Sequence, residues 1–229
     1  MSKSLKKGRL SPQLKECLEF YQELGAEFIF QRGHSDENQM DDEEIRFLSL
    51  EEEIRSCQRC DLARTRTHAV PGEGNRKAEL LFVGEAPGRD EDLQGRPFVG
   101  RAGALLTKII KAMNFSREEV YITNVVKCRP PHNRTPTRKE IMSCYPYLLE
   151  QIELIKPKVI VALGGVAAKF FIPEAPGIMK IRGKWHEFQG IAVMPTFHPS
   201  YLIRNERDRE RKRMVWEDMQ KVMERLGRK

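Results

Sequence analysis

The stretch that decides the fold runs from Leu80 to Gly103 and reads LLFVGEAPGRDEDLQGRPFVGRAG. Its apolar start, residues 80–83, is typical of a buried strand, and a helical pattern begins at Ala102. A strand that ends in a glycine-rich turn before a helix places its loop at the carboxyl end of a sheet, where open α/β folds build their sites. A phosphate cradle is disfavoured, because the GxGxxG pattern and the Walker lysine are missing and the loop's acidic residues would repel phosphate. A plain connecting loop is the alternative.

The rest of the chain continues this alternation of strands and helices. Further strands are expected at residues 120–126, 158–163 and 191–195, and helices at 102–113, 138–155, 164–170 and 205–226. Such alternation predicts a parallel sheet with right-handed crossovers and helices on both faces. The predicted fold class is therefore α/β.

The first 45 residues differ from the rest. Apolar residues recur at helical spacing over residues 12–30, which predicts an amphipathic helix, and the polar, acidic run 31–44 is typical of a solvated linker. Another helix is expected at 45–54. We therefore expect an amino-terminal extension of residues 1–45, a helix plus an acidic linker, and a main domain of residues 46–229.

The 229-residue chain is basic, with a formal net charge of +7 and a pI of about 9.2. This balance favours a polyanion such as nucleic acid as a partner, although basic proteins also gain solubility in this way. The sequence holds no run of eighteen apolar residues, and its start, MSKSLKKGRL, lacks the apolar core of an export signal. We therefore expect a cytoplasmic protein without membrane contact, associated with the nucleoid if the source is prokaryotic.

Four of the five cysteines have the spacing of metal ligands. Cys57 and Cys60 form a CxxC pair, and Cys128 and Cys144 follow later. Four thiolates complete a shell that both zinc and a [4Fe–4S] cluster accept. The 67 residues between the pairs slightly favour a cluster, because zinc ribbons keep both halves compact. Unrelated buried thiols are the alternative, and the fifth cysteine, Cys17, is expected to be a packed thiol.

Two polar residues and a basic loop follow the expected strands. Asn124 lies near the end of the second strand, and its amide matches the N3–H and O4 edge of uracil or thymine; a backbone cap is the alternative. His198 follows the fourth strand, where a site would lie, and a structural role is its alternative. The loop CRPPHNRTPTR, which begins at Cys128, suits either a nucleic-acid backbone or packing around a metal.

Four motifs together resemble one known family. They are GEAPG from Gly84, GRPFVG from Gly95, TNVVKCRPP from Thr123 and HPSYLIR from His198, with the four cysteines in matching order. From about residue 48 to 215 the chain closely resembles the family 4 uracil-DNA glycosylases, the iron–sulfur members of the uracil-DNA glycosylase superfamily. The resemblance implies a three-layer α/β/α fold on a central four-stranded parallel sheet, with residues 46–229 as the catalytic domain. It also implies a structural [4Fe–4S] cluster on the four cysteines and removal of uracil from DNA, leaving an abasic site, in base excision repair.

The same resemblance implies roles in a uracil pocket. Phe98 resembles the residue that stacks on the flipped-out base, and Asn124 resembles the residue that reads its N3/O4 edge. His198 resembles the residue that hydrogen-bonds uracil O2 as negative charge develops on the leaving base. The resemblance also implies that Gly84, Glu85 and Ala86 line the uracil pocket.

Two carboxylates compete for the role of orienting the attacking water. The best-known superfamily members carry an aspartate where this chain has Ala86, so Glu91 and Glu85 remain, in that order of resemblance. Either could lie near C1′ and offset the oxocarbenium-like charge of the sugar. For Glu91, a solvated charge in an acidic loop is the alternative.

DNA contacts are also implied. Leu202, with Tyr201 or Arg204, would fill the gap that the flipped base leaves. Arg134 and Ser200 would contact the DNA as well.

One histidine bears on the reaction type. His132 lies where a sister group carries a histidine that bonds covalently to the abasic sugar. That group's insertion is absent here, and Glu85 replaces the glutamine of its first motif. We therefore expect release of the free base by a monofunctional enzyme.

Two other classes of protein compete with the glycosylase. One is a binding module that grips uracil-containing DNA without turnover, and the other is a redox iron–sulfur or zinc protein with a small-molecule substrate. The intact set Glu85, Glu91, Asn124 and His198 argues against the binding module. We expect a monomer that acts on single- or double-stranded DNA, with residues 1–45 available to recruit a replication or repair protein.

Overall fold

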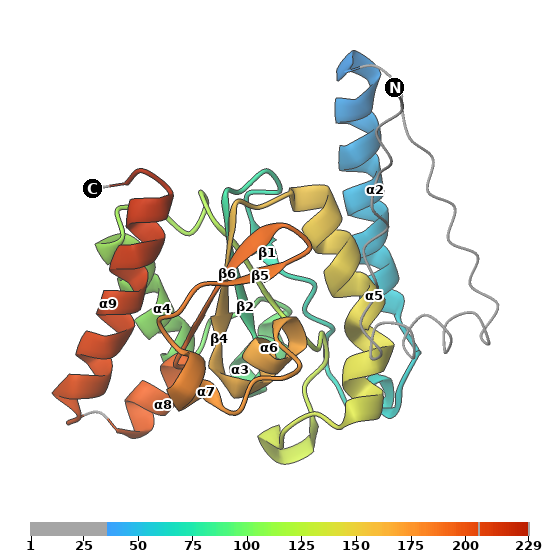
Figure 1. The fold of residues 1–229 in the computed structure, drawn as a ribbon. Coiled ribbons are helices and arrows are strands. Elements are labelled where there is room, and N and C mark those ends of the chain that lie inside the picture. The colour runs from blue at the N-terminus through green and yellow to red at the C-terminus, as the bar shows by residue number, and fades with distance from the viewer. Residues whose placement is uncertain (1–35, 206, 229) are drawn as a thin grey trace, which may run out of the picture. The chain divides into compact units, whose positions relative to one another are not determined.

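The computed structural model describes residues 36–205 and 207–228, and its centre is a sheet of six strands (Figure 1). The strands are β1 (Glu73–Gly74), β2 (Leu80–Gly84), β3 (Tyr121–Asn124), β4 (Val159–Leu163), β5 (His186–Phe188) and β6 (Ile191–Thr196). Their order is β1-β3-β2-β4-β6-β5. The four inner strands run parallel, and β1 and β5 pair antiparallel at the two edges. The chain reverses its direction across the sheet between β2 and β4, which is where doubly wound folds place their ligands.

Longer helices cover both faces of the sheet, with short helical turns in the loops (Figure 1). The helices are α2 (Asp36–Ser56), α4 (Arg101–Ala112), α5 (Arg138–Ile155), α6 (Gly164–Phe171), α8 (Pro199–Arg204) and α9 (Arg209–Arg225). The short turns are η1 (Asp61–Arg64), α3 (Arg89–Gln94), η2 (Pro131–Asn133) and α7 (Ile178–Ile181).

The alternation of side chains along β2 shows how the layers form. Leu81 and Val83 point to one face, where they join a core with residues of α2, α5 and α6. Leu80 and Phe82 point to the other, toward α4, α8 and α9. Because both faces of β2 and β4 are buried, these strands read as continuous apolar runs, whereas β3, which is also buried, ends in the polar residues Thr123 and Asn124.

The predicted three-layer α/β/α fold on four parallel strands is confirmed. The four predicted strands and the helices expected at 102–113, 138–155 and 164–170 are found with small shifts of their ends. The helix expected at 45–54 begins earlier, at Asp36, and the helix expected at 205–226 begins later, at Arg209. Strands β1 and β5 were not predicted from the sequence. These edge strands are two and three residues long and partly exposed, so they carry no apolar run that could mark them.

The predicted acidic linker is wrong for residues 36–44, which form the first part of α2. Ion pairs join two acidic residues of this segment to the main domain: Lys156 binds Glu43 at 2.6 Å, and Arg76 binds Glu44. The helix predicted over residues 12–30 lies outside the described residues.

Among the residues that the structure describes, no helix is both long enough and apolar enough to cross a membrane.

Candidate active site

A pocket of about 550 Å³ opens at the carboxyl ends of the parallel strands. Its walls come from the loops that follow β2, β3, β4 and β6, with additional residues from α7 and α8. Of the predicted site residues it brings together Glu85, Ala86, Glu91, Phe98, Asn124, Arg134, His198, Ser200, Tyr201 and Arg204. Segments more than 100 residues apart in the chain thus meet in one place, as the parallel topology predicts.

Asn124 ends β3 with a buried amide whose oxygen has no partner among the residues that the structure describes. The residue is 2% exposed, and Asn124 Oδ1 accepts no hydrogen bond. A buried polar atom without a partner costs about 1–3 kcal/mol, so this acceptor is suited to a donor that a ligand brings. Gly84 pairs with Asn124 across the sheet, and a Cβ there would lie 2.3 Å from Oδ1. The glycine therefore leaves the edge of the amide open.

Lys127 is hydrogen-bonded to residues at the end of β3 and to helix α5. Its Nζ donates to Thr123 Oγ1 at 2.7 Å, to the carbonyl of Asn124 at 2.8 Å and to Gln151 Oε1 at 2.6 Å. Complete burial lowers the pKa of this ammonium to about 7. The sequence analysis did not predict this role; the available signal was a lysine within the otherwise apolar run before Cys128.

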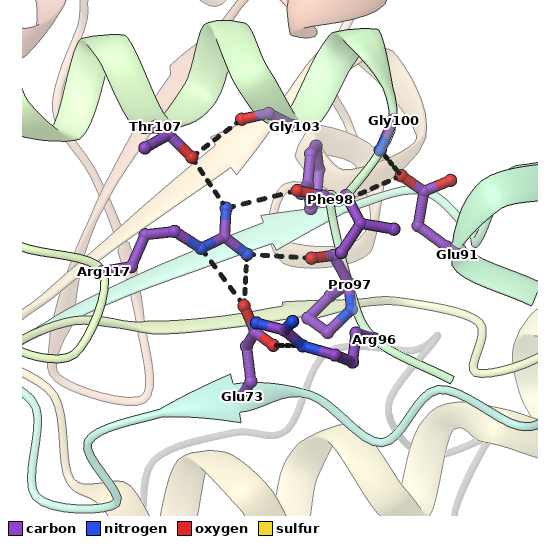
Figure 2. A network of polar contacts seen from close by, with 10 residues as sticks. Glu73, Glu91, Arg96, Pro97, Phe98, Gly100, Gly103, Thr107 and Arg117 are labelled. Carbon is purple, nitrogen blue, oxygen red and sulfur yellow. Dashed lines mark hydrogen bonds and ion pairs between the residues drawn. The ribbon is translucent and has the colours of Figure 1, made fainter. Parts of the chain in front are cut away.

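Phe98 forms one wall of the pocket in an unusual backbone conformation. Its φ is +51°, its side chain is 5% exposed, and its ring stacks on that of His198 with 5.6 Å between centroids. The left-handed region is sparsely populated by bulky side chains, so the surrounding contacts must hold it there. Figure 2 shows that main-chain groups beside this residue are bonded by Arg117 on one side and Glu91 on the other.

His198 precedes the first turn of α8 and caps it. The backbone N–H of Ser200 donates to His198 Nδ1 at 3.1 Å, so Nδ1 is an acceptor and the proton of a neutral ring lies on Nε2. Burial, and to a lesser extent the positive charge of Arg204, lower the imidazole pKa to about 4. Gly164 allows the histidine to approach closely, because a Cβ there would lie 3.0 Å from His198 Cβ.

The two candidate carboxylates have different surroundings. Glu91 accepts from the N–H groups of Gly88 at 3.1 Å, Val99 at 2.9 Å and Gly100 at 3.0 Å, which pins the loop around Phe98. Glu85 lies on the pocket wall with a hydrogen bond from Thr135, and burial raises the pKa of its carboxyl. These contacts favour Glu85 over Glu91 as the freer carboxylate, the reverse of the order that the resemblance suggested.

The residues predicted to contact DNA lie in different surroundings. Leu202 is 3% exposed, because α8 turns its side chain into the core that it shares with α4 and α9. Tyr201 and Arg204, its neighbours on α8, line the pocket instead. Arg134 also lines it, but both of its terminal nitrogens bind Glu140, at 2.8 and 2.6 Å. His132 is exposed in the loop that follows Cys128 and does not line the pocket.

The four predicted metal ligands gather beside α5, away from the pocket lining. Cys57 and Cys60 are partly exposed, Cys128 and Cys144 are buried, and all four are free of disulfides. Two N–H donors are aimed at their sulfurs: Arg66 Nη1 at 3.0 Å from Cys128 Sγ, and the Arg59 amide at 3.4 Å from Cys57 Sγ.

The surroundings of these four thiols bear on whether they could bind a metal. Across the described residues, no three His, Cys, Asp or Glu side chains converge tightly enough to grip one metal ion. A zinc ion with Zn–S bonds of about 2.3 Å would require thiolates about 3.8 Å apart. Burial and the neighbouring thiols raise the pKa of Cys128 and Cys144. Thiolates here thus need a compensating positive charge, which a bound metal centre would supply.

The fold and the pocket define an α/β protein whose site suits a flat, polar ring. The Uracil DNA glycosylase superfamily matches residues 71–220. The chain is 52% identical to the type-4 uracil-DNA glycosylase of Thermotoga maritima over 175 residues, which cover 76% of this chain and 91% of that protein. It is 48% identical to the type-4 enzyme of Archaeoglobus fulgidus over 185 residues, 77% and 92% of the two chains. A type-5 uracil-DNA glycosylase of Pyrobaculum aerophilum is 35% identical over 150 residues, which cover 58% of this chain and 66% of that protein. The chain belongs to the uracil-DNA glycosylase superfamily, which confirms the resemblance that the motifs carried.

We expect the His198 ring to stay neutral at physiological pH. In ¹⁵N NMR of histidine-labelled protein its midpoint should lie near pH 4, with the proton on Nε2 at pH 7, because burial opposes the charged form. The unfolded chain then binds a proton that the folded chain does not, so stability should fall as pH falls from about 6.5 toward 4. The His198→Gln variant identifies the signal, and a midpoint near pH 6.5 would contradict this assignment.

Proposed function

We propose that this protein is a monofunctional uracil-DNA glycosylase that flips uracil out of DNA and hydrolyses its N-glycosidic bond, leaving an abasic site for base excision repair. The observation that carries the proposal is the buried Oδ1 of Asn124, which has no partner among the described residues and lines one pocket with the Phe98 ring. The names of the type-4 relatives, at 52% and 48% identity, support the same activity.

Base recognition follows from the amide of Asn124. Uracil presents an N3–H donor and an O4 acceptor side by side, which meet Oδ1 and Nδ2 of the amide. Cytosine presents the opposite pattern, an N3 acceptor and an N4 donor, so both contacts would be mismatched. Since each mismatched buried group costs about 1–3 kcal/mol, the pocket should reject cytosine strongly.

His198 would stabilise the departing base. Its Nδ1 is committed to the Ser200 amide, so Nε2–H is the donor left for uracil O2. Negative charge grows on this oxygen as the glycosidic bond breaks, and a hydrogen bond that strengthens with that charge accelerates the reaction. A neutral ring suffices for this role, because it already carries the required proton.

Glu85 is our choice for the carboxylate that orients the attacking water. It lies on the pocket wall, and the positive charge of Arg204 is close enough to act on its pKa. An ionised carboxylate near C1′ would also offset the oxocarbenium-like charge of the sugar. Glu91, whose oxygens already accept three backbone hydrogen bonds, would shape the loop instead.

The four cysteines would hold a [4Fe–4S] cluster with a structural role. Bound there, the group supplies a covalent cross-link among the segment 57–60, the loop after β3 and helix α5. Cys128 follows Asn124 by four positions, so this link would fix the segment that carries the base-reading amide.

The DNA substrate suits the charge of the protein, which is +7 overall. Arg204, Tyr201 and Ser200, at the rim of the pocket, are proposed to contact the strand beside the flipped base, and Arg134 to add a contact from the loop after β3. The catalytic domain would comprise residues 46–229 and act as a cytoplasmic monomer. Residues 1–45 would recruit a replication or repair protein.

The experiment that tests the function uses the full chain and a labelled oligonucleotide with one uracil. Alkali-sensitive cleavage should appear at uracil for the wild type. The Asn124→Asp variant should lose about 5- to 150-fold at uracil, the equivalent of one hydrogen bond of about 1–3 kcal/mol, and gain measurable cleavage at cytosine. Binding of uracil-containing DNA by cluster-loaded wild type without any base release would favour the binding module instead.

The choice between the two carboxylates can be tested by matched substitutions. Glu85→Gln should lower the single-turnover rate about 100-fold or more with little change in melting temperature, as expected for a group that activates water. Glu91→Gln should mainly lower the melting temperature, because it weakens the clamp on three backbone amides. The reverse pattern would return the catalytic role to Glu91.

The cluster proposal predicts a specific cysteine requirement. Purified wild type should contain about four irons per chain and absorb visible light, and Cys144→Ser should lose both, because the buried thiolate completes the ligand set. Cys17→Ser is the control and should retain iron. One zinc ion per chain in place of iron, or iron content unaffected by Cys144→Ser, would contradict the assignment.

A further inference from the structure

Arg117 belongs to none of the four motifs, yet its side chain bonds the loop that carries Phe98, one of the pocket residues (Figure 2). It belongs to the turn that precedes β3, and its side chain is 16% exposed. The guanidinium donates to two consecutive backbone carbonyls, of Pro97 at 2.9 Å and of Phe98 at 3.2 Å. It therefore bonds directly to the peptide groups that set the direction of the Phe98 ring.

A second set of contacts fixes the guanidinium itself. Glu73, in the edge strand β1, accepts from Nε at 3.1 Å and also pairs with Nη2. Thr107 on α4 accepts from Nη1 at 3.1 Å and donates in turn to the Gly103 carbonyl. Arg117 thus connects the edge of the sheet, the loop and α4, and Figure 2 shows all three meeting at its guanidinium.

Phe98 requires such restraint because its φ of +51° is sparsely populated by bulky residues. Three groups hold it from different sides. Arg117 holds the carbonyls, Glu91 holds the following amides of Val99 and Gly100, and α4 presses against it where a Cβ at Gly103 would lie 1.7 Å from the Phe98 carbonyl oxygen.

We propose that Arg117 is a positioning residue that orients Phe98 for stacking on the flipped uracil. This inference rests on the proposed function, in which Phe98 supplies the stacking face. Asn124 ends β3 and His198 precedes α8, and the hydrogen-bond partners of Arg117 within the described part of the chain are Glu73, Pro97, Phe98 and Thr107. The loss of Arg117 should therefore weaken stacking before it affects the hydrogen bonds to the base.

The planar guanidinium group of Arg117, with its several N–H donors, is needed to position Phe98. One guanidinium can face two adjacent carbonyls while its remaining N–H groups bind Glu73 and Thr107. A lysine carries the same charge as a single compact ammonium and cannot reproduce that geometry. The substitution Arg117→Lys therefore keeps the charge and removes the fork.

The test is a double-mutant cycle in the full chain with its metal centre loaded. Single-turnover excision of uracil is compared among wild type, Arg117→Lys, Phe98→Ala and the double variant. Arg117→Lys should lower the rate about 5- to 150-fold, the range that stacking of one base supplies, and should have little further effect once the Phe98 ring is gone. An equal loss in both backgrounds, or no loss in either, would overturn the proposal.

Arg76→Lys is the matched control for general destabilisation. Arg76 pairs with Glu44 and with Glu51 at 3.1 Å, and its guanidinium lies 5.0 Å from the centroid of the Phe47 ring, which belongs to the core on the face of the sheet opposite to Phe98. It should lower the melting temperature while leaving the excision rate of the folded enzyme close to that of the wild type. A comparable loss of rate in this control would reduce the effect of Arg117 to stability alone.

Hydrogen exchange provides a readout that does not depend on turnover. The Val99 and Gly100 amides should exchange faster in Arg117→Lys than in wild type, because the loop loses one of its restraints. If the wild type releases no uracil, the proposed function fails, but these amides still test the clamp. Unchanged exchange would overturn the positioning role in either case.

Discussion

The close approach of β2 and β3 at their carboxyl ends is the constraint on which the site depends. The parallel register sets Gly84 opposite Asn124, and a Cβ at Gly84 would lie 2.3 Å from Asn124 Oδ1 and 2.6 Å from the Phe98 ring. The missing side chain leaves room for the amide, the aromatic ring and, in the proposed function, the edge of a base. A buried amide oxygen without a partner persists because the sheet fixes the backbone on both sides of it.

Buried and partly buried polar side chains hold the irregular segments around this point. Main-chain groups in loops lack the partners that strands and helices provide, so side chains must supply them. Lys127 bonds the carbonyl of Asn124, Glu91 bonds three amides of the loop around Phe98, and Arg117 bonds two carbonyls of that loop. These residues contribute rigidity that a short loop could not supply alone, and a site that must match one base against another requires it.

Much of the fold and several site residues were predictable from local signals. Strands buried on both faces are mostly apolar, so β2, β3, β4 and β6 were found, and helix α5 was predicted with the bounds that the structure shows. The motifs that carry Phe98, Asn124 and His198 pointed to one pocket because parallel strands end at one edge of the sheet. The edge strands β1 and β5 and the helical start of α2 were missed, since short exposed strands and acidic helix termini carry no apolar pattern.

The sequence by itself determined the α/β class, the residue types of the site and membership in the superfamily, because periodicity and motifs are local properties of the chain. The tertiary structure decided what each polar group faces. It turned Leu202 into the core, committed Glu91 to backbone amides, put the proton of neutral His198 on Nε2, and brought Lys127 and Arg117 to the base-reading loops. The reason is physical: a side chain's role depends on its partners and its exposure to water, and these are fixed only when distant segments pack together.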